Sequence, residues 1–414
     1  MTGSTDDRAR VSLGHSYWRL WSSAGLSNLA DGIFKVALPL IAIQYTRDPT
    51  LIAGLAVAGG LPWLVFSLYA GAVSDRQDRR VVMVSANVVR ASLVGLLALA
   101  IASDTATIAI LYLVAFCVGM AETLYDTSAQ SILPQVVDHR LLSRANGRLY
   151  AAELTANQFV GPPLGGLLVT VGAALVMVGS AGVWFGAAGL LLLLRGSFRT
   201  GHDRTTTIRA DVAEGLRFLG GHRVLRAMAL LTGMGNLAFS AAFAVLVLFA
   251  VGDDSPMGLT DPGYGVLLTT TAVGALLGTF LAEHVEKALG RSRTLVLMIV
   301  VTSAALAAPA LTSSPWIIGG FLAASGVTVV FGNVVMVSLR QRVTPNRLLG
   351  RVNSAYRLVA WGTMPLGAMF GGLVASWWGI RMTFALAAII SVSTLGVMYV
   401  LTDANIDAAE KDIE

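Results

Sequence analysis

Arg140-Leu-Leu-Ser-Arg-Ala-Asn146 recurs 207 residues later as Arg347-Leu-Leu-Gly-Arg-Val-Asn353, and this recurrence decides how the rest of the sequence is interpreted. A second pair of matching segments has nearly the same offset, because Gly25-Leu-Ser-Asn-Leu-Ala30 reappears as Gly233-Met-Gly-Asn-Leu-Ala238. Two matches at one spacing indicate an internal repeat. It divides the 414 residues into two halves of nearly equal length.

The composition places both halves in a membrane. Hydrophobic residues make up 55% of the chain and charged residues 13%, which is more apolar surface than a soluble domain can bury. Segments of about 20 apolar residues match the roughly 30 Å hydrocarbon core of a bilayer. Twelve such segments are predicted: 17–44, 51–70, 81–102, 106–128, 149–171, 173–194, 224–250, 263–283, 294–312, 315–338, 355–376 and 380–402. We therefore predict an all-α membrane protein of twelve transmembrane helices in two parallel six-helix repeats.

The basic residues are distributed unevenly over the two sides that these spans define. Of the 29 lysines and arginines, 25 fall on the side that carries both termini. Two lie on the other side, Arg47 and Arg381, and two lie inside spans, Lys35 and Arg90. By the positive-inside rule we expect a multi-pass protein of the cytoplasmic membrane with both termini in the cytoplasm. Because basic residues set orientation here, the net charge of +5 does not indicate nucleic acid as a partner.

The segment between the halves is predicted to be a linker. We place an N-terminal six-helix bundle at 1–195, a cytoplasmic linker at 196–223, and a C-terminal six-helix bundle with an acidic tail at 224–414. In the second part of the linker, apolar residues recur every three or four positions between charged ones, as in an amphipathic helix at the membrane surface. These apolar residues are Ile208, Val212, Leu216 and Leu219. A passive tether and a regulatory element both fit this pattern.

A short charged loop follows the second predicted span: Gly71-Ala-Val-Ser-Asp-Arg-Gln-Asp-Arg-Arg80. Gly71 lets neighbouring helices approach, and the Asp75 carboxylate can accept hydrogen bonds from a helix N-terminus in the opposite half. Such a contact would latch the outward-facing arrangement of the halves. The basic residues of the candidate latch are Arg76, Arg79 and Arg80. A role in setting topology would explain the last two equally well, but it would not explain Asp75.

This loop resembles the one that identifies the major facilitator superfamily, with Asp78 where the family pattern has a glycine. Together with Leu349-Gly-Arg-Val-Asn-Ser354 and Met364-Pro-Leu-Gly367, it makes essentially the whole chain similar to the macrolide-efflux type of proton-coupled drug exporters. The resemblance implies a twelve-helix fold around a central cavity and amphipathic drug-like substrates or macrolides. It also implies proton antiport, with the proton gradient as energy source and no cofactor.

Gly161-Pro-Pro-Leu-Gly-Gly166 in the fifth span resembles the end of the antiporter signature of that superfamily, and Gly367-Ala-Met-Phe-Gly-Gly372 in the eleventh is its near-copy. The match is partial, because Asn157 and Arg148 stand where the family pattern has glycines. Prolines remove backbone donors and glycines permit bending, so this segment is a candidate hinge. Its hinge residues are Gly161, Pro162, Gly165 and Gly166. Ordinary packing of small residues is an equally good explanation.

Ionisable residues inside spans cost roughly 2.5–3.5 kcal/mol at the helix centre, so each is a candidate functional residue. Asp31 lies about 21 Å into the first span at 1.5 Å per residue, near the bilayer midplane. We therefore expect Asp31 to be the first candidate for the proton carrier. Lys35 is its neighbour one helical turn further on, and an internal ion pair between the two is the alternative.

Arg90 in the third span and Glu122 in the fourth lie at similar depths, so the sequence also favours a contact between these two side chains. Asp126 is one turn away from Glu122 on the same face. Glu122 and Asp126 are the reserve candidates for the proton carrier. Superfamily members often carry an arginine in the fourth span, and Arg90 is the residue that would replace it here. A purely structural ion pair is the alternative role.

Polar and aromatic residues of several spans are candidates for the wall of a substrate cavity. The candidates are Asn28, Phe34, Asn157, Gln158, Asn236, Phe239 and Trp361. Glu153 precedes the two polar residues of the fifth span. Buried amides more often form hydrogen bonds between helices, and aromatic residues more often pack helices or mark interfaces.

Motifs of other protein classes are missing from the sequence. It has no Gly-x-x-x-x-Gly-Lys-Ser/Thr phosphate loop and no His-Glu-x-x-His or Gly-x-Ser-x-Gly motif, so we expect a transporter and not an enzyme. Cys117 is the only cysteine, and we expect neither a disulfide nor a metal site. We expect a monomer with a small amphipathic molecule, protons and the lipid bilayer as its partners. The alternatives are export of a siderophore or self-made metabolite, and a non-transporting sensor or scaffold.

Overall fold

The computed structural model describes residues 13–196, 198, 208–345 and 348–411, and every element in these ranges is a helix. Within this part of the chain, ten helical segments are long and apolar enough to cross a membrane. They are α1 (Gly14–Tyr45), α4 (Arg79–Ala102), α5 (Ile108–Val136), α8 (Ala173–Leu192), α10 (Arg223–Ala250), α11 (Asp261–Leu289), α12 (Arg291–Leu311), α13 (Pro315–Arg342), α14 (Leu349–Trp378), and α15 (Ile380–Ser393) with its continuation η3 (Thr394–Tyr399). The helical class predicted from the sequence is confirmed.

The other two predicted spans are interrupted in the structure. The span at 51–70 consists of α2 (Pro49–Val65) and α3 (Ser67–Arg76). The span at 149–171 is built from α6 (Leu142–Leu154), the π-helix η2 (Thr155–Val160) and α7 (Gly161–Val171). Neither is a single long helix, so the ten spans above fall short of the twelve predicted.

Prolines account for the position of both interruptions. Pro62 lies one turn before the break between α2 and α3, where Phe66 leaves regular helical geometry at φ −108°. Pro162 and Pro163 lie in the first turn of α7, just after η2, and have no N–H to donate to the carbonyls of the preceding turn. A π-helical turn inside a helix is uncommon and often marks a functional site.

Capping residues and glycines define several helix ends. The Asp48 carboxylate accepts hydrogen bonds from the first backbone amides of α2, and Thr107 caps α5 in the same way. Gly290, at φ +80°, and Gly379, at φ +88°, each join two consecutive helices through a single residue, in a conformation that favours glycine. Short connections of this kind keep consecutive helices adjacent and antiparallel.

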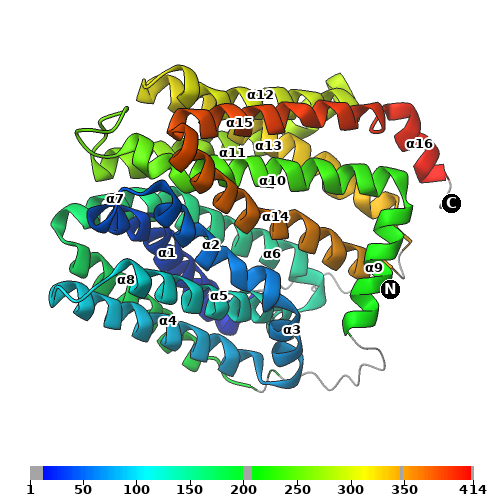
Figure 1. Ribbon diagram of the computed structural model, residues 1–414. Coiled ribbons are helices and arrows are strands. Elements are labelled where there is room, and N and C mark those ends of the chain that lie inside the picture. The colour runs from blue at the N-terminus through cyan, green and yellow to red at the C-terminus, as the bar shows by residue number, and fades with distance from the viewer. Residues whose placement is uncertain (1–12, 197, 199–207, 346–347, 412–414) are drawn as a thin grey trace, which may run out of the picture.

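The helices form two layers in Figure 1, an N-terminal group from α1 to α8 and a C-terminal group from α10 to α16 (Asp403–Lys411). The helix α9 (Ile208–Gly221) packs on α10 and α14. The helices α16 and α9 lie at one end of the bundle in Figure 1, and α1 begins toward the same end, which we call the termini side. The two groups contact each other mainly through α2 against α14 and through α7 against α11.

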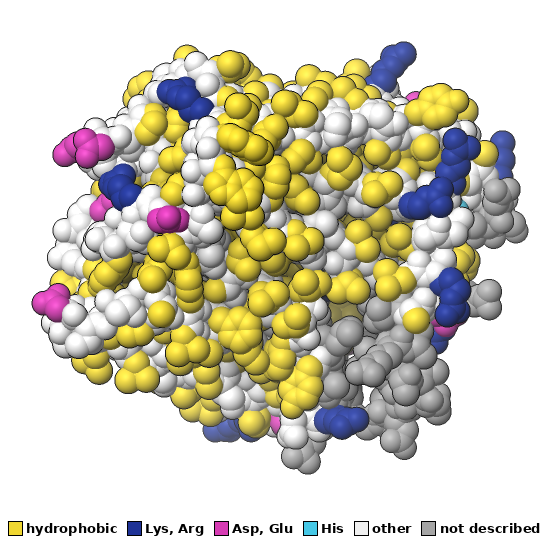
Figure 2. Space-filling model, in the orientation of Figure 1, with side chains coloured by type: hydrophobic (Ala, Val, Ile, Leu, Met, Phe, Trp, Pro, Cys, Tyr) yellow, Lys and Arg dark blue, Asp and Glu magenta, His cyan; other side chains and the backbone are white. Residues whose placement is uncertain are grey.

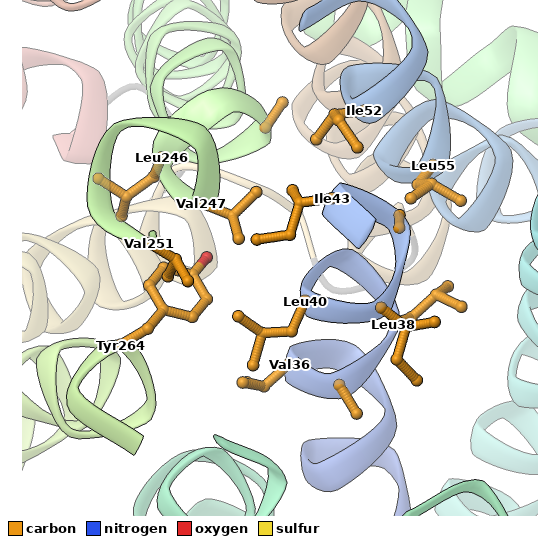
Figure 3. Close-up of a cluster of buried hydrophobic side chains, with 14 of the residues drawn as sticks. Val36, Leu38, Leu40, Ile43, Ile52, Leu55, Leu246, Val247, Val251 and Tyr264 are labelled. Carbon is orange, nitrogen blue, oxygen red and sulfur yellow. The ribbon is translucent and has the colours of Figure 1, made fainter. Parts of the chain in front are cut away.

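The largest hydrophobic cluster joins both groups near the end opposite the termini. Val36, Leu40 and Ile43 of α1 extend toward Val247 of α10 and Tyr264 of α11, as Figure 3 shows. All five side chains are buried. Among the ten spans, α1 and α10 have the largest buried fractions, so these two helices lie at the centre of the bundle.

Close backbone contacts seal the groups against each other on this opposite side. Gly166 of α7 is packed so tightly that an added Cβ atom would collide with the carbonyl oxygen of Asp261 in α11. Arg47, in the loop after α1, donates a hydrogen bond of 3.2 Å to the carbonyl of Val251. The described residues therefore pack the two groups together at the end away from the termini.

The surface matches a protein that is surrounded by lipid. In Figure 2 hydrophobic side chains cover the middle of the visible face, and charged side chains gather at its two ends. Large apolar residues are widely exposed, including Leu99, Phe280, Trp316 and Trp377. An exposed apolar surface of this extent would be unstable in water.

Candidate functional site

Arg90 forms the centre of a buried polar cluster in the N-terminal group. Its side chain, on α4, is fully covered. Nη1 donates to Asp31 Oδ1 of α1 at 2.8 Å, and Nη2 donates to Ser27 Oγ at 2.9 Å and to Asn87 Oδ1. A buried charge is tolerated only where it is paired and hydrogen-bonded, and Arg90 meets both conditions.

Aromatic rings cover the remaining faces of this guanidinium group. The Cζ atom of Arg90 lies 4.8 Å from the centre of the Tyr125 ring and 5.3 Å from that of Trp184. Both rings are themselves buried. Cation–π contacts of this kind stabilise a desolvated guanidinium. The cluster therefore ties α1, α4, α5 and α8 together and is closed to water.

A second ion pair lies one helical turn further along α1 and is accessible to water. Lys35 Nζ is 2.9 Å from Glu122 Oε1 of α5, and the two side chains are 50% and 16% exposed. Between Leu20 and Ile43, Lys35 is the single exposed residue of α1, and all the others are buried or half-buried. Because α1 lies at the centre of the bundle, this exposure indicates a water-accessible space between the helices.

The pairing of these four charges differs from the one that the sequence indicated. The sequence left an internal pair of Asp31 with Lys35 as the alternative role of these residues and favoured a contact of Arg90 with Glu122, but the structure exchanges the partners. Asp31 points to α4, whereas Lys35, one turn away, points to α5. The exchange has a physical reason, because the fully covered Arg90 is paired with the more deeply buried of the two carboxylates.

Two further carboxylates lie near this pair. Asp126 is one helical turn from Glu122 on α5 and is half-buried. Glu153 is exposed on α6, close enough to interact electrostatically with Lys35. Within the described part of the chain, neither carboxylate forms an ion pair or a side-chain hydrogen bond. The site thus has more carboxylates than cations to pair with them.

The C-terminal group contributes mainly aromatic side chains to the middle of the bundle. Trp361 of α14 is 40% exposed and lies 4.8 Å, centre to centre, from Trp63 of α2. Phe239, 37% exposed, stacks on Phe243 of the same helix α10 at 3.9 Å. Trp361 and Phe239 were predicted as cavity residues, whereas Arg357, four residues before Trp361, was counted only among the arginines that set orientation. The sequence signal that could have identified Arg357 was its position one helical turn before a tryptophan.

The amides predicted to line a cavity mostly bond to the backbone or to each other. Asn157 Nδ2 donates to Asn28 Oδ1 at 3.4 Å, which connects η2 with α1. Asn236 Nδ2 donates to the carbonyl of Ala360 at 2.7 Å, which connects α10 with α14. Gln158 is exposed. Asn28, Asn157 and Asn236 therefore connect helices in this arrangement. Gln158 is the one exposed amide of the four.

Phe34 does not lie at a water-accessible surface, contrary to its interpretation as a cavity residue. Its side chain is 6% exposed and belongs to the largest hydrophobic cluster. The ring packs edge-on against Trp184 at 5.8 Å. Phe34 and Lys35 are consecutive residues of α1, yet one side chain is buried and the other is exposed. Their positions in the sequence did not predict this difference.

The candidate hinge lies against α1. An added Cβ atom at Gly161 would come within 2.7 Å of the Cα of Gly32, and one at Gly165 within 2.8 Å of the carbonyl oxygen of Ile33. Pro162 is buried in the same contact region between α7 and its neighbours. These small residues allow η2 and α7 to approach α1, so close helix packing is their observed role. Gly166 makes the corresponding contact with α11 in the other group.

In the charged loop, Asp78 has a role that the sequence did not reveal. Its carboxylate is buried, caps α4 by accepting from Arg80 N at 3.0 Å, and accepts from Phe198 N at 3.1 Å. Arg79 Nη1 donates to the carbonyl of Ser131 at 2.6 Å. The residue that replaces the glycine of the family pattern therefore fixes the loop to the start of the linker.

The other latch members with described side chains, Gly71, Arg76 and Arg80, show no contact with the C-terminal group. Asp75 lies in α3, but its side chain is outside the part of the structure that is described. A Cβ atom added at Gly71 would meet nothing within 4 Å, so no helix approaches it closely in this arrangement. Arg76 is exposed at the end of α3, and Arg80 donates to the carbonyl of Leu194. The latch stays a prediction for another state.

Among the residues with described placement, no three histidine, cysteine, aspartate or glutamate side chains are grouped so that they could hold a metal ion. Cys117 of α5 is a free, half-buried thiol. The chemistry of the site therefore rests on carboxylates, two cations and aromatic rings.

Comparison with known proteins adds to this geometry. The model of the family MFS_3, described as transmembrane secretion effector, matches residues 13–413. The multidrug efflux pump Tap of Mycolicibacterium fortuitum is 28% identical over 394 residues, which are 91% of this chain and 92% of that protein. Macrolide efflux protein A of Streptococcus pyogenes is 20% identical over 382 residues, or 90% of this chain and 92% of that protein.

Solved structures share the fold at low sequence identity. The crystal structure of the nucleoside transporter NupG has a TM-score of 0.78 and 11% identity, over 94% of this chain and 100% of that chain. A bacterial homologue of the iron transporter ferroportin, in an inward-facing state, has a TM-score of 0.73 and 16% identity, over 94% and 98%. At these identities the likeness concerns the fold alone.

Proposed function

Because the chain belongs to the MFS_3 family of transmembrane secretion effectors, and so to the transporters of the major facilitator superfamily, we propose that it exports amphipathic, drug-like compounds in exchange for protons. The activities named for its relatives support export, since they are a multidrug efflux pump and a macrolide efflux protein. The protein is an integral membrane transporter. Its coupling ion and its substrates are the subject of the proposal.

The proposed topology has twelve spans, both termini in the cytoplasm, and a location in the cytoplasmic membrane. The ten long helices and the two interrupted segments, α2 with α3 and α6 with η2 and α7, give six spans in each group. The internal sequence repeat supports this division. The concentration of 25 of the 29 basic residues on the termini side supports the orientation.

The observation that carries proton coupling is the water-accessible pair of Lys35, on the most buried span α1, and Glu122 of the neighbouring α5. A proton carrier has to meet water from either side in turn and must change its charge when it does so. Protonation of Glu122 would release Lys35 from its ion pair, and loss of the proton would restore the pair. Asp126, which has no ion-pair partner among the described residues, is the second candidate.

Asp31 takes a different place in this proposal from the one the sequence favoured. It is held by the fully covered Arg90, and water does not reach that pair in the present arrangement. Protonating Asp31 would leave Arg90 as a buried charge without a counter-ion, which is strongly unfavourable. We therefore assign Asp31 and Arg90 to the support of α1, and Glu122 to the exchange of protons.

The proposed substrates follow from the unequal chemistry of the two groups. The N-terminal group offers carboxylates and one accessible lysine, and the C-terminal group offers exposed rings of Trp361 and Phe239. A molecule with one polar or charged end and one apolar end would fit between such surfaces. This arrangement supports amphipathic compounds, including macrolides, over small hydrophilic solutes.

The arrangement supports an inward-facing state. Close packing of α7 against α11 and of α2 against α14 closes the side away from the termini. Transport would require these contacts to open while the termini side closes, as in the rocking of two halves about a central site. The latch at Asp75 would form only in that second, outward-facing state.

Uptake into inside-out membrane vesicles tests this function. The vesicle lumen corresponds to the outside of the cell, so an exporter driven by protons should concentrate a macrolide or ethidium in the lumen when the lumen is made acidic. We expect no accumulation when a protonophore removes the gradient. Accumulation that is unaffected by the protonophore would contradict proton coupling, and transport of neither probe would favour a siderophore or a self-made metabolite as substrate.

A further inference from the structure

Arg357 is placed differently from the other arginines of the C-terminal group. Its Cζ atom lies 4.6 Å from the centre of the Trp361 ring and 6.0 Å from that of Trp63. The two tryptophans contact each other edge to face, and we call them the tryptophan pair. Because Trp63 belongs to α2 and Trp361 to α14, this stack of one cation and two rings bridges the two groups of helices.

Asp126 lies at the same depth as Arg357 on the other group. Gly119 of α5 is level with Gly59 of α2, since a Cβ atom added at Gly119 would lie 2.5 Å from the carbonyl oxygen of Gly59. From that level, Asp126 is seven residues, or about 10 Å, nearer the termini side. Trp63 follows Gly59 by four residues, so the tryptophan pair lies about 6 Å from the level of Gly59 in the same direction. Arg357 precedes Trp361 by four residues, so it lies about another 6 Å nearer the termini side. The two charges therefore differ in depth by only about 2 Å along the helix axes.

Asp126 and Arg357 carry opposite formal charges but form no ion pair among the described residues. Arg357 and Asp126 are close enough for their charges to interact. In the described residues, Asp126 has no ion-pair partner, and Arg357 contacts only the rings. The groups touch on the opposite side and, through α2 and α14, at the tryptophan pair, but no described contact joins Asp126 of α5 to Arg357. A rocking motion that brings α5 toward α14 would shorten the distance between these two side chains.

We propose that Asp126 and Arg357 form an ion pair between the two groups when the termini side closes, and that the tryptophan pair holds the guanidinium ready for this in the present state. This inference rests on the proposed alternating-access function. The ion pair stabilises the outward-facing state, because it exists only there. Arg357 acts as a positioning residue for the conformational change.

Distance measurements between spin labels on the termini side test the proposal. Gln135→Cys at the end of α5 and Arg293→Cys at the start of α12 are exposed positions in the two groups, and Cys117→Ala removes the native thiol. We expect Asp126→Asn and Arg357→Gln each to lower the population with the shorter distance about fivefold, the effect of an ion pair worth about 1 kcal/mol. The swap of Asp126→Arg with Arg357→Asp should restore it.

Arg340→Gln is the matched control. The Arg340 guanidinium lies 4.2 Å from the centre of the Tyr356 ring, but both residues belong to the C-terminal group, so this substitution should leave the distances unchanged. If the swapped protein does not fold, the double variant Asp126→Asn with Arg357→Gln replaces it as the test of coupling between the two residues. It should shift the population no further than either single variant does, whereas additive shifts would overturn the ion pair.

The test separates this inference from the proposed function. Distances are measured without substrate and without a pH gradient, so they report the conformational equilibrium alone. Unchanged populations in both single variants would remove the ion pair and leave proton-driven export standing. Shifted populations in a protein that fails to transport either probe would retain the ion pair and remove the proposed function.

Discussion

Arg90 Nη1 lies 2.8 Å from Asp31 Oδ1, and water reaches neither side chain to more than 6%. This pair connects α1 with α4 at the centre of the N-terminal group. One turn along α1, Lys35 forms the exposed pair with Glu122. Two ion pairs of similar length thus lie one helical turn apart, one closed to water and one open to it, and we propose different roles for them.

Asp31→Asn should therefore destabilise the protein, because it leaves Arg90 charged and buried without a counter-ion. Breaking a buried pair in this way costs about 3–5 kcal/mol. The melting temperature of the purified protein in detergent measures the effect. Replacing both partners, Asp31→Leu with Arg90→Met, should recover most of the stability. A melting temperature equal to that of the parent in Asp31→Asn would show that this pair does not support α1.

Asp78→Ala should lower stability by about 1–2 kcal/mol, because α4 loses its N-cap and Phe198 N loses its acceptor. Asp78→Asn should retain most of it, since the amide oxygen still accepts a hydrogen bond. Asp48→Ala is the matched control at the other membrane side, where the cap of α2 is lost but the linker is untouched. Protease cleavage within 196–223 reports the linker, and equal cleavage in both alanine variants would contradict a specific role of Asp78.

Gly166→Ala should hinder closure on the side away from the termini, because the new methyl group collides with the backbone of Asp261 in α11. Spin labels at Ala102→Cys and Asp254→Cys, both exposed on that side, measure the separation of the groups. We expect a larger population with the longer distance. Gly182→Ala is the control, since an added Cβ atom there meets nothing within 4 Å. Identical distance distributions in the two variants would argue against this contact as the seal.

The orientation in the membrane can be tested with the same exposed loop. Asp254→Cys, in a protein without Cys117, should react with a membrane-impermeant thiol reagent added to intact cells. Gln135→Cys should react only after lysis, because Gln135 lies on the termini side of the bundle, opposite to Asp254. The reverse pattern would overturn the assignment of the termini to the cytoplasm.

Much of the fold followed from local properties of the sequence. Apolar length and the positions of the arginines do not depend on tertiary contacts, so ten of the predicted spans correspond to long helices. The interruptions at Phe66 and in η2 were not predicted. A short break with a proline does not change the hydropathy of a segment, and hydropathy was the basis of the twelve spans.

The candidate site was predicted in its composition and not in its contacts. Asp31, Lys35, Arg90 and Glu122 were all identified, because charged residues inside apolar segments are rare and costly. Their pairing depends on which neighbouring helix each face of α1 meets, and a single sequence does not contain that information. Arg357 was missed for a related reason. Its position near the end of a span made it resemble the arginines that set topology, and only the ring of Trp63 from the other group revealed the contact.

The central claim is that Glu122 exchanges protons, and uptake by inside-out vesicles of the Glu122→Gln variant tests it most directly. The parent and the control Glu283→Gln, which loses an exposed ion pair with Lys287 on the termini side, should concentrate the macrolide in an acidic lumen. Glu122→Gln imitates the protonated carboxyl permanently, so its accumulation should fall at least about tenfold, to the level of passive equilibration. Accumulation by Glu122→Gln at the level of the parent, under the same pH gradient, would contradict the account.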